Sequence, residues 1–260
     1  MAGDLKIAAA ALAGAAFLAV PVRAETPVTA FPAAADSAEW TTLLSKYVDG
    51  RGLVAYADWR GDAEDRKRLR EVIAGFAEAA PPPPPDARLA SLFNAYNAFI
   101  IETVLDRYPV ASIRAIPGAF TAETHRFGGR LCSLDEIEHA AVALGGYRAH
   151  AAMVCASRSC PPLDRRAFAA EGLSRRLDER MRAWLARPDL WQFEPAENLV
   201  RAPRYLDWYR GDFERAGIPR LLSEYAPARF RGWLARGAFR LEYLDYDWSL
   251  NDRTAGRGRE

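Results

Sequence analysis

The residues best suited to chemistry lie together between Arg148 and Leu163, where the chain reads RAHAAMVCASRSCPPL. This stretch holds one of the three histidines, His150, and two of the three cysteines, Cys155 and Cys160. A thiolate is a strong nucleophile, and a nearby imidazole can lower the pKa of a thiol and carry its proton. The stretch therefore predicts a cysteine-dependent hydrolase or transferase, with Cys155 as nucleophile and His150 as base.

A second histidine precedes this stretch on a predicted helix. His139 is the alternative base, and Glu138 or Asn97 would orient the imidazole. In papain-like and transglutaminase-like enzymes the cysteine precedes the histidine, whereas here no histidine follows Cys155. Such constellations are defined by geometry, so this order does not exclude an enzyme. The predicted catalytic residues are Cys155, His150, His139 and Glu138, and the predicted supporting residues are Asn94, Asn97, Ser157 and Cys160.

The two cysteines also allow a non-catalytic interpretation. The turn between Cys155 and Cys160 would let the two sulfurs meet, although their spacing is not the C-x-x-C of thioredoxin-like proteins. A bridge would prevent Cys155 from acting as a resting nucleophile, so the alternative is an envelope binding or scaffold protein with a structural or redox disulfide. A zinc site from His139, His150 and both cysteines ranks lower, because the spacings match no common ligand pattern. We expect neither a metal nor a cofactor.

The first 24 residues have the pattern of a signal peptide. A short charged start is followed by an apolar run, Ile7 to Val20, and by small residues up to Ala24. The run is short for a bilayer span, so we expect cleavage before Glu25, a periplasmic or secreted protein, and no membrane span after cleavage. An oxidising compartment favours disulfides, and an odd number of cysteines leaves at least one outside any internal pair.

The chain after this leader is electrically neutral. It carries 33 basic and 33 acidic side chains. Surfaces that bind nucleic acid or anionic lipid are strongly basic, so we expect no nucleic-acid partner and instead a small-molecule, peptide or envelope substrate. The length suits one large domain, over residues 53–251, preceded by an arm and helix over 25–52 and followed by a polar tail over 252–260.

The spacing of apolar residues predicts mostly helices. They are expected over Ser37–Tyr47, Asp62–Ala79, Ala87–Arg107, Leu134–Leu144, Asp164–Arg187, Tyr205–Phe213, Ile218–Tyr225 and Ala228–Leu234. Ser133 and Glu136 form a capping box for the fourth of these. Extended segments are expected at Leu53–Tyr56, in a hairpin around Gly128-Gly129, at Ala149–Val154 as a buried strand, at Gln192–Ala202 and at Phe239–Trp248. This mixed order predicts a single, helix-rich α+β domain with a small sheet.

Buried amides and clustered aromatic residues accompany these elements. Asn94 and Asn97 lie on an otherwise apolar helix, and because buried amides need partners we expect them to tie neighbouring loops together. Six aromatic residues near the C-terminus predict core or rim packing, or a groove for a sugar or peptide: Tyr205, Trp208, Tyr209, Tyr243, Tyr246 and Trp248.

Several motifs together resemble a known family. They are NAYNAF from Asn94, YPVASIR from Tyr108, SLDEIEH from Ser133, the sixteen-residue cysteine stretch from Arg148, and YDWSLN from Tyr246. They are similar to domain-of-unknown-function family 547, as found in exported bacterial proteins, over roughly Leu53 to Asn251. The resemblance implies that Cys155 and Cys160 are the meaningful pair, since Cys132 falls where the pattern has no cysteine. Some eukaryotic relatives join this domain to a glutaredoxin-like domain, which points to thiol chemistry by analogy alone.

Overall fold

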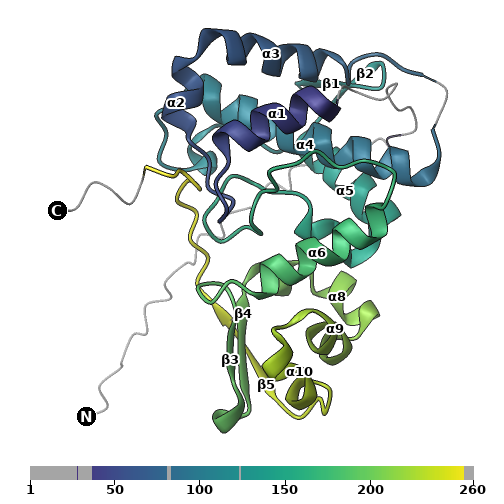
Figure 1. Ribbon diagram of the computed structural model, residues 1–260, viewed down its shortest axis with the longest axis vertical. Helices are drawn as coiled ribbons and strands as arrows, with labels where there is room; N and C mark the ends of the chain where they lie inside the picture. The colour runs from purple at the N-terminus through teal and green to yellow at the C-terminus, as the bar shows by residue number, and fades with distance from the viewer. Residues whose placement is uncertain (1–27, 29–36, 81–82, 123, 255–260) are drawn as a thin grey trace, which may run out of the picture.

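The computed structural model describes residues 28, 37–80, 83–122 and 124–254. The predicted signal peptide lies outside these residues. Two regions are stacked along the long axis of the molecule (Figure 1). Helices α1–α5 form the upper region, and strands β3–β5 with helices α8–α10 form the lower one. The predicted helix-rich α+β fold is confirmed.

The elements follow the chain in this order. The α-helices are α1 Ser37–Tyr47, α2 Tyr56–Gly61, α3 Ala63–Ala74, α4 Pro85–Arg107, α5 Leu134–Gly145, α6 Leu173–Leu185, α7 Tyr205–Trp208, α8 Arg210–Ala216, α9 Ile218–Tyr225 and α10 Ala228–Leu234. The 3₁₀-helices in the described residues are η1 Ile113–Ala115, η2 Gly146–Ala151 and η3 Pro195–Glu197. The strands are β1 His125–Phe127, β2 Arg130–Cys132, β3 Gln192–Glu194, β4 Leu199–Pro203 and β5 Arg240–Leu244.

Helix α4 is the centre of the upper region. Pro85 stands in its first turn, where a missing N–H costs nothing, and almost every residue from Leu89 to Leu105 is buried. A helix that is apolar on all sides must be covered on all sides. Helices α1, α2, α3 and α5 pack in the same core, and Tyr47 of α1 stacks on Trp59 of α2 with 4.5 Å between ring centroids.

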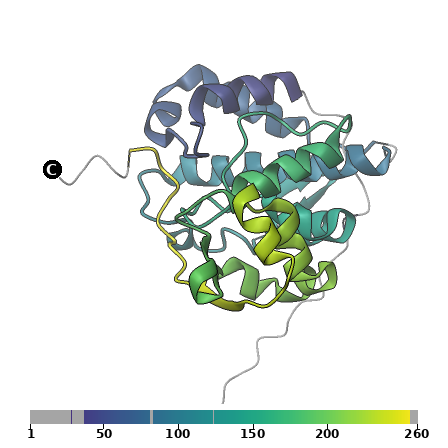
Figure 2. The same cartoon turned by 60° about the horizontal axis from the view of Figure 1, so that its bottom comes forward.

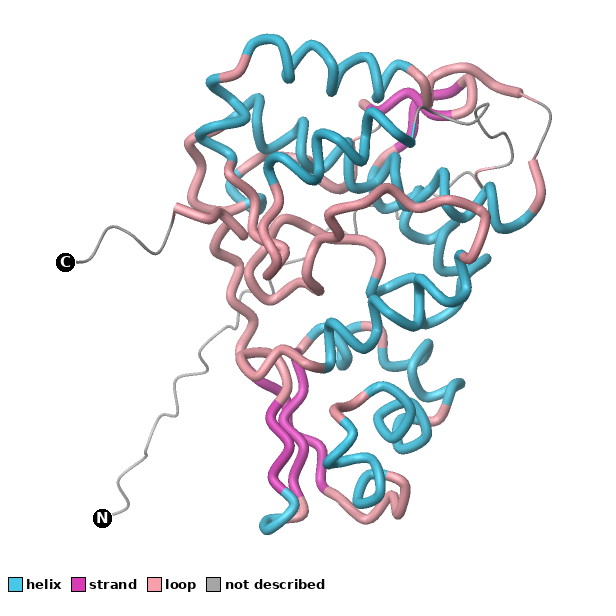
Figure 3. The backbone as a smooth tube through the Cα atoms, in the orientation of Figure 1, coloured by secondary structure: helices cyan, strands magenta, loops and turns pink. Residues whose placement is uncertain are grey.

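The lower region has its own core, which is rich in large aromatic side chains. Strands β3 and β4 are antiparallel, and β5 joins β4 in parallel. Asn198 turns the chain between β3 and β4: it has a φ of 50°, and its side chain accepts a 3.1 Å hydrogen bond from Nε1 of Trp233. Trp184 of α6 meets Trp191 edge to face. Figure 2 turns this region toward the reader, and Figure 3 shows that loops fill the zone between the two regions.

Several local predictions are confirmed. Helices α1, α9 and α10 have the predicted bounds. The hairpin turns at Gly128-Gly129, and the capping box joins Ser133 and Glu136 reciprocally. Local signals of this kind depend on neighbours in sequence, which explains their success. In the part of the chain that is described, no helix is both long and apolar enough to cross a membrane.

The predicted strand over Ala149–Val154 is wrong. Residues 146–151 form the 3₁₀-helix η2, which begins at Gly146, with a φ of 60°, directly after the end of α5 at Gly145. The apolar run is short and rich in alanine, a residue that prefers a helical backbone, and periodicity cannot separate a short buried strand from a buried helical turn.

The predicted long helix over Asp164–Arg187 is wrong in its first part, since α6 begins only at Leu173. The side-chain amide of Asn94 bonds both the N–H and the carbonyl of Phe168, at 2.9 and 2.8 Å, so these groups are not available to a helix. Similarly, Leu53–Tyr56 contains only isolated bridges at Val54, and Tyr56 opens the unpredicted helix α2.

Candidate functional site

A disulfide closes the loop that follows η2. Cys155 and Cys160 are bonded through their sulfurs, with 6.3 Å between their Cα atoms. Ala156 has a φ of 62°, an unusual conformation for a residue with a side chain, and it turns the chain between the two cysteines. Cys132 is buried in the upper core and takes no part in this bond.

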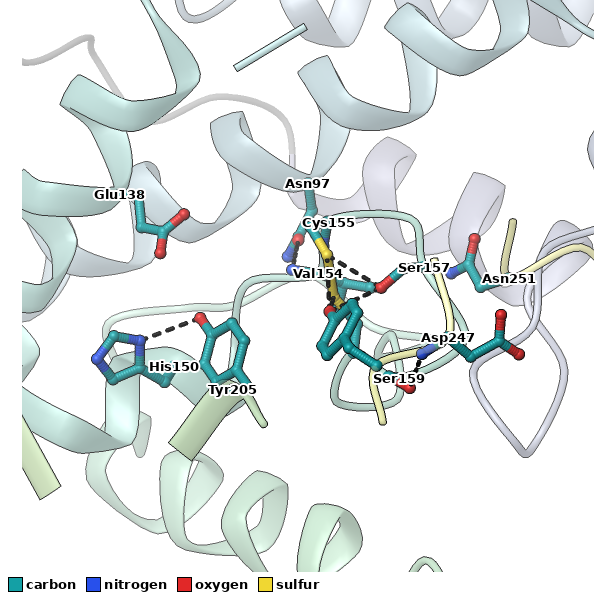
Figure 4. The surroundings of a disulfide bond; sticks show 12 residues. Asn97, Glu138, His150, Val154, Cys155, Ser157, Ser159, Tyr205, Asp247 and Asn251 are labelled. Atoms are coloured by element: carbon teal, nitrogen blue, oxygen red, sulfur yellow. Dashed lines mark hydrogen bonds between the residues drawn. A yellow bond between two sulfur atoms is a disulfide. The ribbon is translucent and has the colours of Figure 1, made fainter. Parts of the chain in front are cut away.

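Residues 246–251, the C-terminal segment, hold this loop in place through hydrogen bonds. Main-chain hydrogen bonds run from Arg158 to Ser249 and from Asn251 to Ala156, both at 2.9 Å. The hydroxyl of Tyr246 lies 2.7 Å from Oγ of Ser157 and 3.3 Å from each sulfur of the disulfide. Residues far apart in sequence thus hold the disulfide in one position (Figure 4).

The two asparagines of α4 act as clamps on loops, as predicted. Asn97 donates to the carbonyl of Ala152 at 2.9 Å and accepts from the N–H of Val154 at 3.0 Å, so it fixes the chain just before the disulfide. Asn94 makes the matching pair of bonds to Phe168. Each amide therefore donates one hydrogen bond and accepts one, and so pairs main-chain groups that would otherwise be buried without partners.

A cavity of about 290 Å³ opens beside the disulfide. Aromatic residues supply most of its wall, together with two carboxylates and both bonded cysteines. The lining residues are Tyr96, Phe120, Thr121, Asp135, Glu138, Met153, Cys155, Cys160, Tyr205, Trp208, Tyr209, Tyr246 and Trp248. This volume is at the lower end of the range for small-molecule sites, so the cavity suits a small ligand.

Glu138 is the deepest charged group of the cavity. Only 7% of its surface is exposed, and its Oε2 accepts a 3.1 Å hydrogen bond from the hydroxyl of Tyr96. Its Oε1 is buried and accepts no hydrogen bond from the residues described. Burial and, second, the Glu138 charge raise the pKa of Tyr96, Tyr205 and Tyr209 well above the usual value, so these phenols stay protonated.

The structure places His150 in a separate polar contact. Its ring nitrogens lie 3.1 Å from the hydroxyl of Tyr205 and 2.9 Å from Oδ2 of Asp212. Burial lowers the pKa of His150, against the opposing effect of Asp212. Figure 4 shows the contact with Tyr205 next to Glu138 and the disulfide. His139 is exposed on α5, and neither histidine lines the cavity.

The structure therefore brings together part of the predicted site. Glu138, Cys155 and Cys160 share the cavity, and Ser157 contacts Tyr246 beside it. The catalytic roles assigned to Cys155, His150, His139 and Glu138 stay predictions. Across the described ranges, no group of three or more His, Cys, Asp or Glu side chains is arranged to hold a metal ion.

Sequence reasoning missed two acidic residues. Asp135 lines the cavity with Glu138, and Asp212 bonds His150. Asp135 and Glu138 are three residues apart on α5, a spacing that places side chains on one helix face and would have predicted the pair. Asp212 had no such signal, because its partner is distant in sequence. Among the six C-terminal aromatic residues, five line the cavity and Tyr243 does not.

These features define a helix-rich α+β protein with a disulfide-closed loop beside an aromatic, acidic cavity. Residues 84–185 match the model of a family described as "Protein of unknown function, DUF547". This match supports the resemblance seen in the motifs, and it covers α4 through α6 with the disulfide, both amide clamps and Glu138. Comparisons with curated proteins and with solved structures gave no match.

Proposed function

We propose that this chain is an exported binding protein that holds a small molecule in the cavity beside Cys155 and Cys160. The cavity itself is the observation that carries the proposal. It is concave and mostly aromatic, with few polar groups, which is the usual composition of a small-molecule site. Trp208 is 47% exposed at its edge, although large aromatic side chains are normally covered.

The disulfide supports binding rather than catalysis. A sulfur bonded to another sulfur has no thiolate with which to attack a substrate. The two cysteines lie where Asn97, Tyr246 and the C-terminal segment already fix the loop, as expected of a bond that secures a cavity wall. The two ring nitrogens of His150, one of which would have to accept the proton of a nucleophile, contact Tyr205 and Asp212 instead.

The proposed location is the periplasm or the extracellular space. The signal-peptide pattern of residues 1–24 supports export, and disulfides persist in oxidising compartments. Intact mass of the protein recovered from a bacterial periplasm tests this proposal. A mature N-terminus at Glu25 is expected, and a full-length, cytoplasmic product would contradict it.

The binding proposal is tested by thermal unfolding with a panel of neutral sugars, organic anions and organic cations. At least one class should raise the melting temperature of the wild type, because a ligand that binds only the folded state stabilises it. The same class should raise the melting temperature of Trp208→Ala much less, because this variant lacks one aromatic ring of the cavity lining. If no class shifts the wild type, or if the variant responds equally, the cavity is not a binding site.

A cysteine-dependent hydrolase or transferase is the second candidate. The observation in its favour is that Cys155 is partly exposed to the cavity while Cys160 is buried. Reduction would therefore present the Cys155 thiol to the cavity that Glu138 also lines. Alkylation with and without reductant, followed by peptide mapping, separates the two functions. Rapid labelling of Cys155 without reductant favours the enzyme, and a Cys155–Cys160 linked peptide favours the binding protein.

A further inference from the structure

The charge that lines the cavity has one sign. Asp135 and Glu138 are acidic, and no arginine, lysine or histidine belongs to the lining that the described residues form. Arg114 is close by, with its guanidinium 5.0 Å from the ring centroid of Trp248, but it is not part of the lining. A cleft lined by charges of one sign, with apolar walls, concentrates the electric field inside it. The interior is therefore attractive to positive charge.

The buried carboxylate of Glu138 has few hydrogen bonds to compensate its charge. Glu138 is 93% buried, and the phenols of Tyr96 and Tyr209 are the groups that interact with its carboxylate; Oε2 accepts from Tyr96, and Oε1 accepts no hydrogen bond of ordinary geometry from the described residues. Removing a carboxylate from water is costly unless hydrogen bonds or an opposite charge compensate. Figure 4 shows the Glu138 side chain aimed at the zone between Tyr205 and the disulfide. A ligand with a positive charge would supply the missing compensation.

The aromatic wall suits one kind of cation. Trp208, Tyr246 and Trp248 lie in contact, with ring centroids 4.7, 5.6 and 4.5 Å apart in the three pairs. Aromatic faces attract organic cations such as quaternary ammonium groups. They offer a hard metal ion none of the oxygen ligands that it prefers. The position of Arg114 over Trp248 is an example of this attraction within the molecule.

We propose that the ligand of this cavity is a small organic cation, whose charged group lies between the Glu138 carboxylate and the faces of the aromatic wall. This inference rests on the binding function proposed above and specifies its ligand class. A volume of about 290 Å³ accommodates a quaternary ammonium or an aromatic amine but not a polymer. Glu138 provides the counter-charge, and the rings provide the contact surface.

Matched pairs of probes test the charge alone. Choline is compared with dimethylbutanol, in which carbon replaces the quaternary nitrogen, and benzylamine is compared with benzyl alcohol. Calorimetry on the wild type should give at least about tenfold tighter binding of one or both cations than of the neutral counterpart, because a nearby buried carboxylate interacts with the charge only. Glu138→Gln keeps the shape of the side chain and should reduce this difference severalfold, leaving the part that the aromatic faces and Asp135 contribute.

Glu102→Gln is the matched control. Glu102 is a partly buried carboxylate on α4 that lines a different cavity, so its substitution should leave the affinity for the cations unchanged. Thermal unfolding of both variants checks that they fold, and Glu138→Gln should be at least as stable as the wild type, because it removes a buried charge.

Three results would overturn the inference: neutral counterparts that bind as tightly as the cations, a Glu138→Gln variant whose preference for cations is undiminished, or binding of neither cation. If neutral sugars or anions still bind in a Trp208-dependent way, the cation inference fails while the proposed binding function stands. If nothing binds, both fail.

Discussion

The two sides of the cavity are held in place by different balances of contacts, although hydrogen bonds of Tyr205 and Tyr246 also tie the C-terminal side to its surroundings. One side, the matched side, comes from the segment that matches the family model and includes Tyr96, Asp135, Glu138, Cys155 and Cys160. It is fixed by directional bonds: a disulfide, the Asn97 clamp and the Tyr96–Glu138 hydrogen bond. The other side, the C-terminal side, comprises Tyr205, Trp208, Tyr209, Tyr246 and Trp248, most of them in ring-to-ring contact.

Because of this difference, we expect the matched side to contribute mainly to folding stability and the exposed edge of the C-terminal side mainly to ligand binding. A directional bond to a buried group leaves an unsatisfied partner when one member is removed, and the full desolvation cost of that partner then appears. Ring contacts are sums of many weak attractions, and a partly exposed ring contributes few of them. Substitutions on the matched side should therefore reduce the free energy of unfolding, whereas substitutions at the exposed edge of the C-terminal side should mainly reduce ligand affinity.

The largest expected effect comes from Asn97→Ala. It removes both bonds to the main chain at Ala152 and Val154 and leaves two buried groups without partners. We expect the free energy of unfolding to fall by about 3 kcal/mol, measured by urea denaturation. Ligand affinity should fall too, because this clamp positions the chain next to the disulfide.

Asn94→Ala is the matched control, since Asn94 bonds Phe168 in the same way and lines a different cavity. It should cost a similar free energy of unfolding without loss of ligand affinity. Equal loss of affinity in the two variants would show that the effect of Asn97 is general destabilisation and would remove the distinction between the two sides.

The second effect is that of Cys155→Ser with Cys160→Ser. A disulfide that closes so short a loop restricts the unfolded chain by about 2 kcal/mol, and we expect the free energy of unfolding to fall by that amount. Reductant should destabilise the wild type to the same extent and leave the double variant unchanged. A double variant as stable as the wild type would mean that the surrounding hydrogen bonds alone fix the loop.

On both sides the sequence predicted local features better than contacts between distant residues, for a physical reason. On the matched side, the Ser133–Glu136 capping box and the amides of α4 depend on short sequence separations or on the general need of a buried amide for partners, and these expectations are confirmed. On the C-terminal side, the aromatic residues were recognised as possible lining, but nothing in their spacing showed that Tyr246 would reach the disulfide. That contact joins residues 86 and 91 positions apart.

The errors in secondary structure have the same origin. The helix predicted from Asp164 fails because a distant side chain, Asn94, occupies the main chain of Phe168. The strand predicted over Ala149–Val154 fails because its apolar pattern fits either conformation; the segment continues from α5 as the 3₁₀-helix η2, and Asn97 binds the main chain of Ala152 and Val154. In both places a tertiary contact or a neighbouring element overrides the local pattern.

The third effect is a loss of folding stability at acidic pH, to which His125 contributes. Burial lowers the pKa of His125, which stacks on Phe99 of α4, to about 4 from the usual 6.5. Well above pH 6.5 the imidazole of His125 is neutral in both the folded and the unfolded state, so its titration does not reduce the free energy of unfolding. As the pH falls from 6.5 toward 4, the unfolded state binds the proton first, and the free energy of unfolding therefore decreases. Because His125 is partly exposed, we expect about 1 kcal/mol of loss near pH 5.

His125→Phe keeps the ring contact with Phe99 and should remove this component from urea denaturation measured across the same pH range. A residual loss is expected from His150, whose pKa is also lowered by burial. If the variant shows the full acid sensitivity of the wild type, His125 does not contribute to it.

A similarly small effect on stability, and the sharpest test of the comparison, is that of Trp208→Ala. Because this ring is 47% exposed, its removal should cost only about 1 kcal/mol of the free energy of unfolding, mainly through lost contacts with Tyr246 and Trp248. Leu144→Ala, at a leucine that is 44% exposed away from the cavity, is the control of similar exposure. Only Trp208→Ala should weaken the binding of an organic cation, by about tenfold, because it deletes one ring face of the wall. If Trp208→Ala and Leu144→Ala bound the cation equally tightly, the affinity would come from the matched side, chiefly from Glu138, and the exposed ring of Trp208 would contribute nothing to binding.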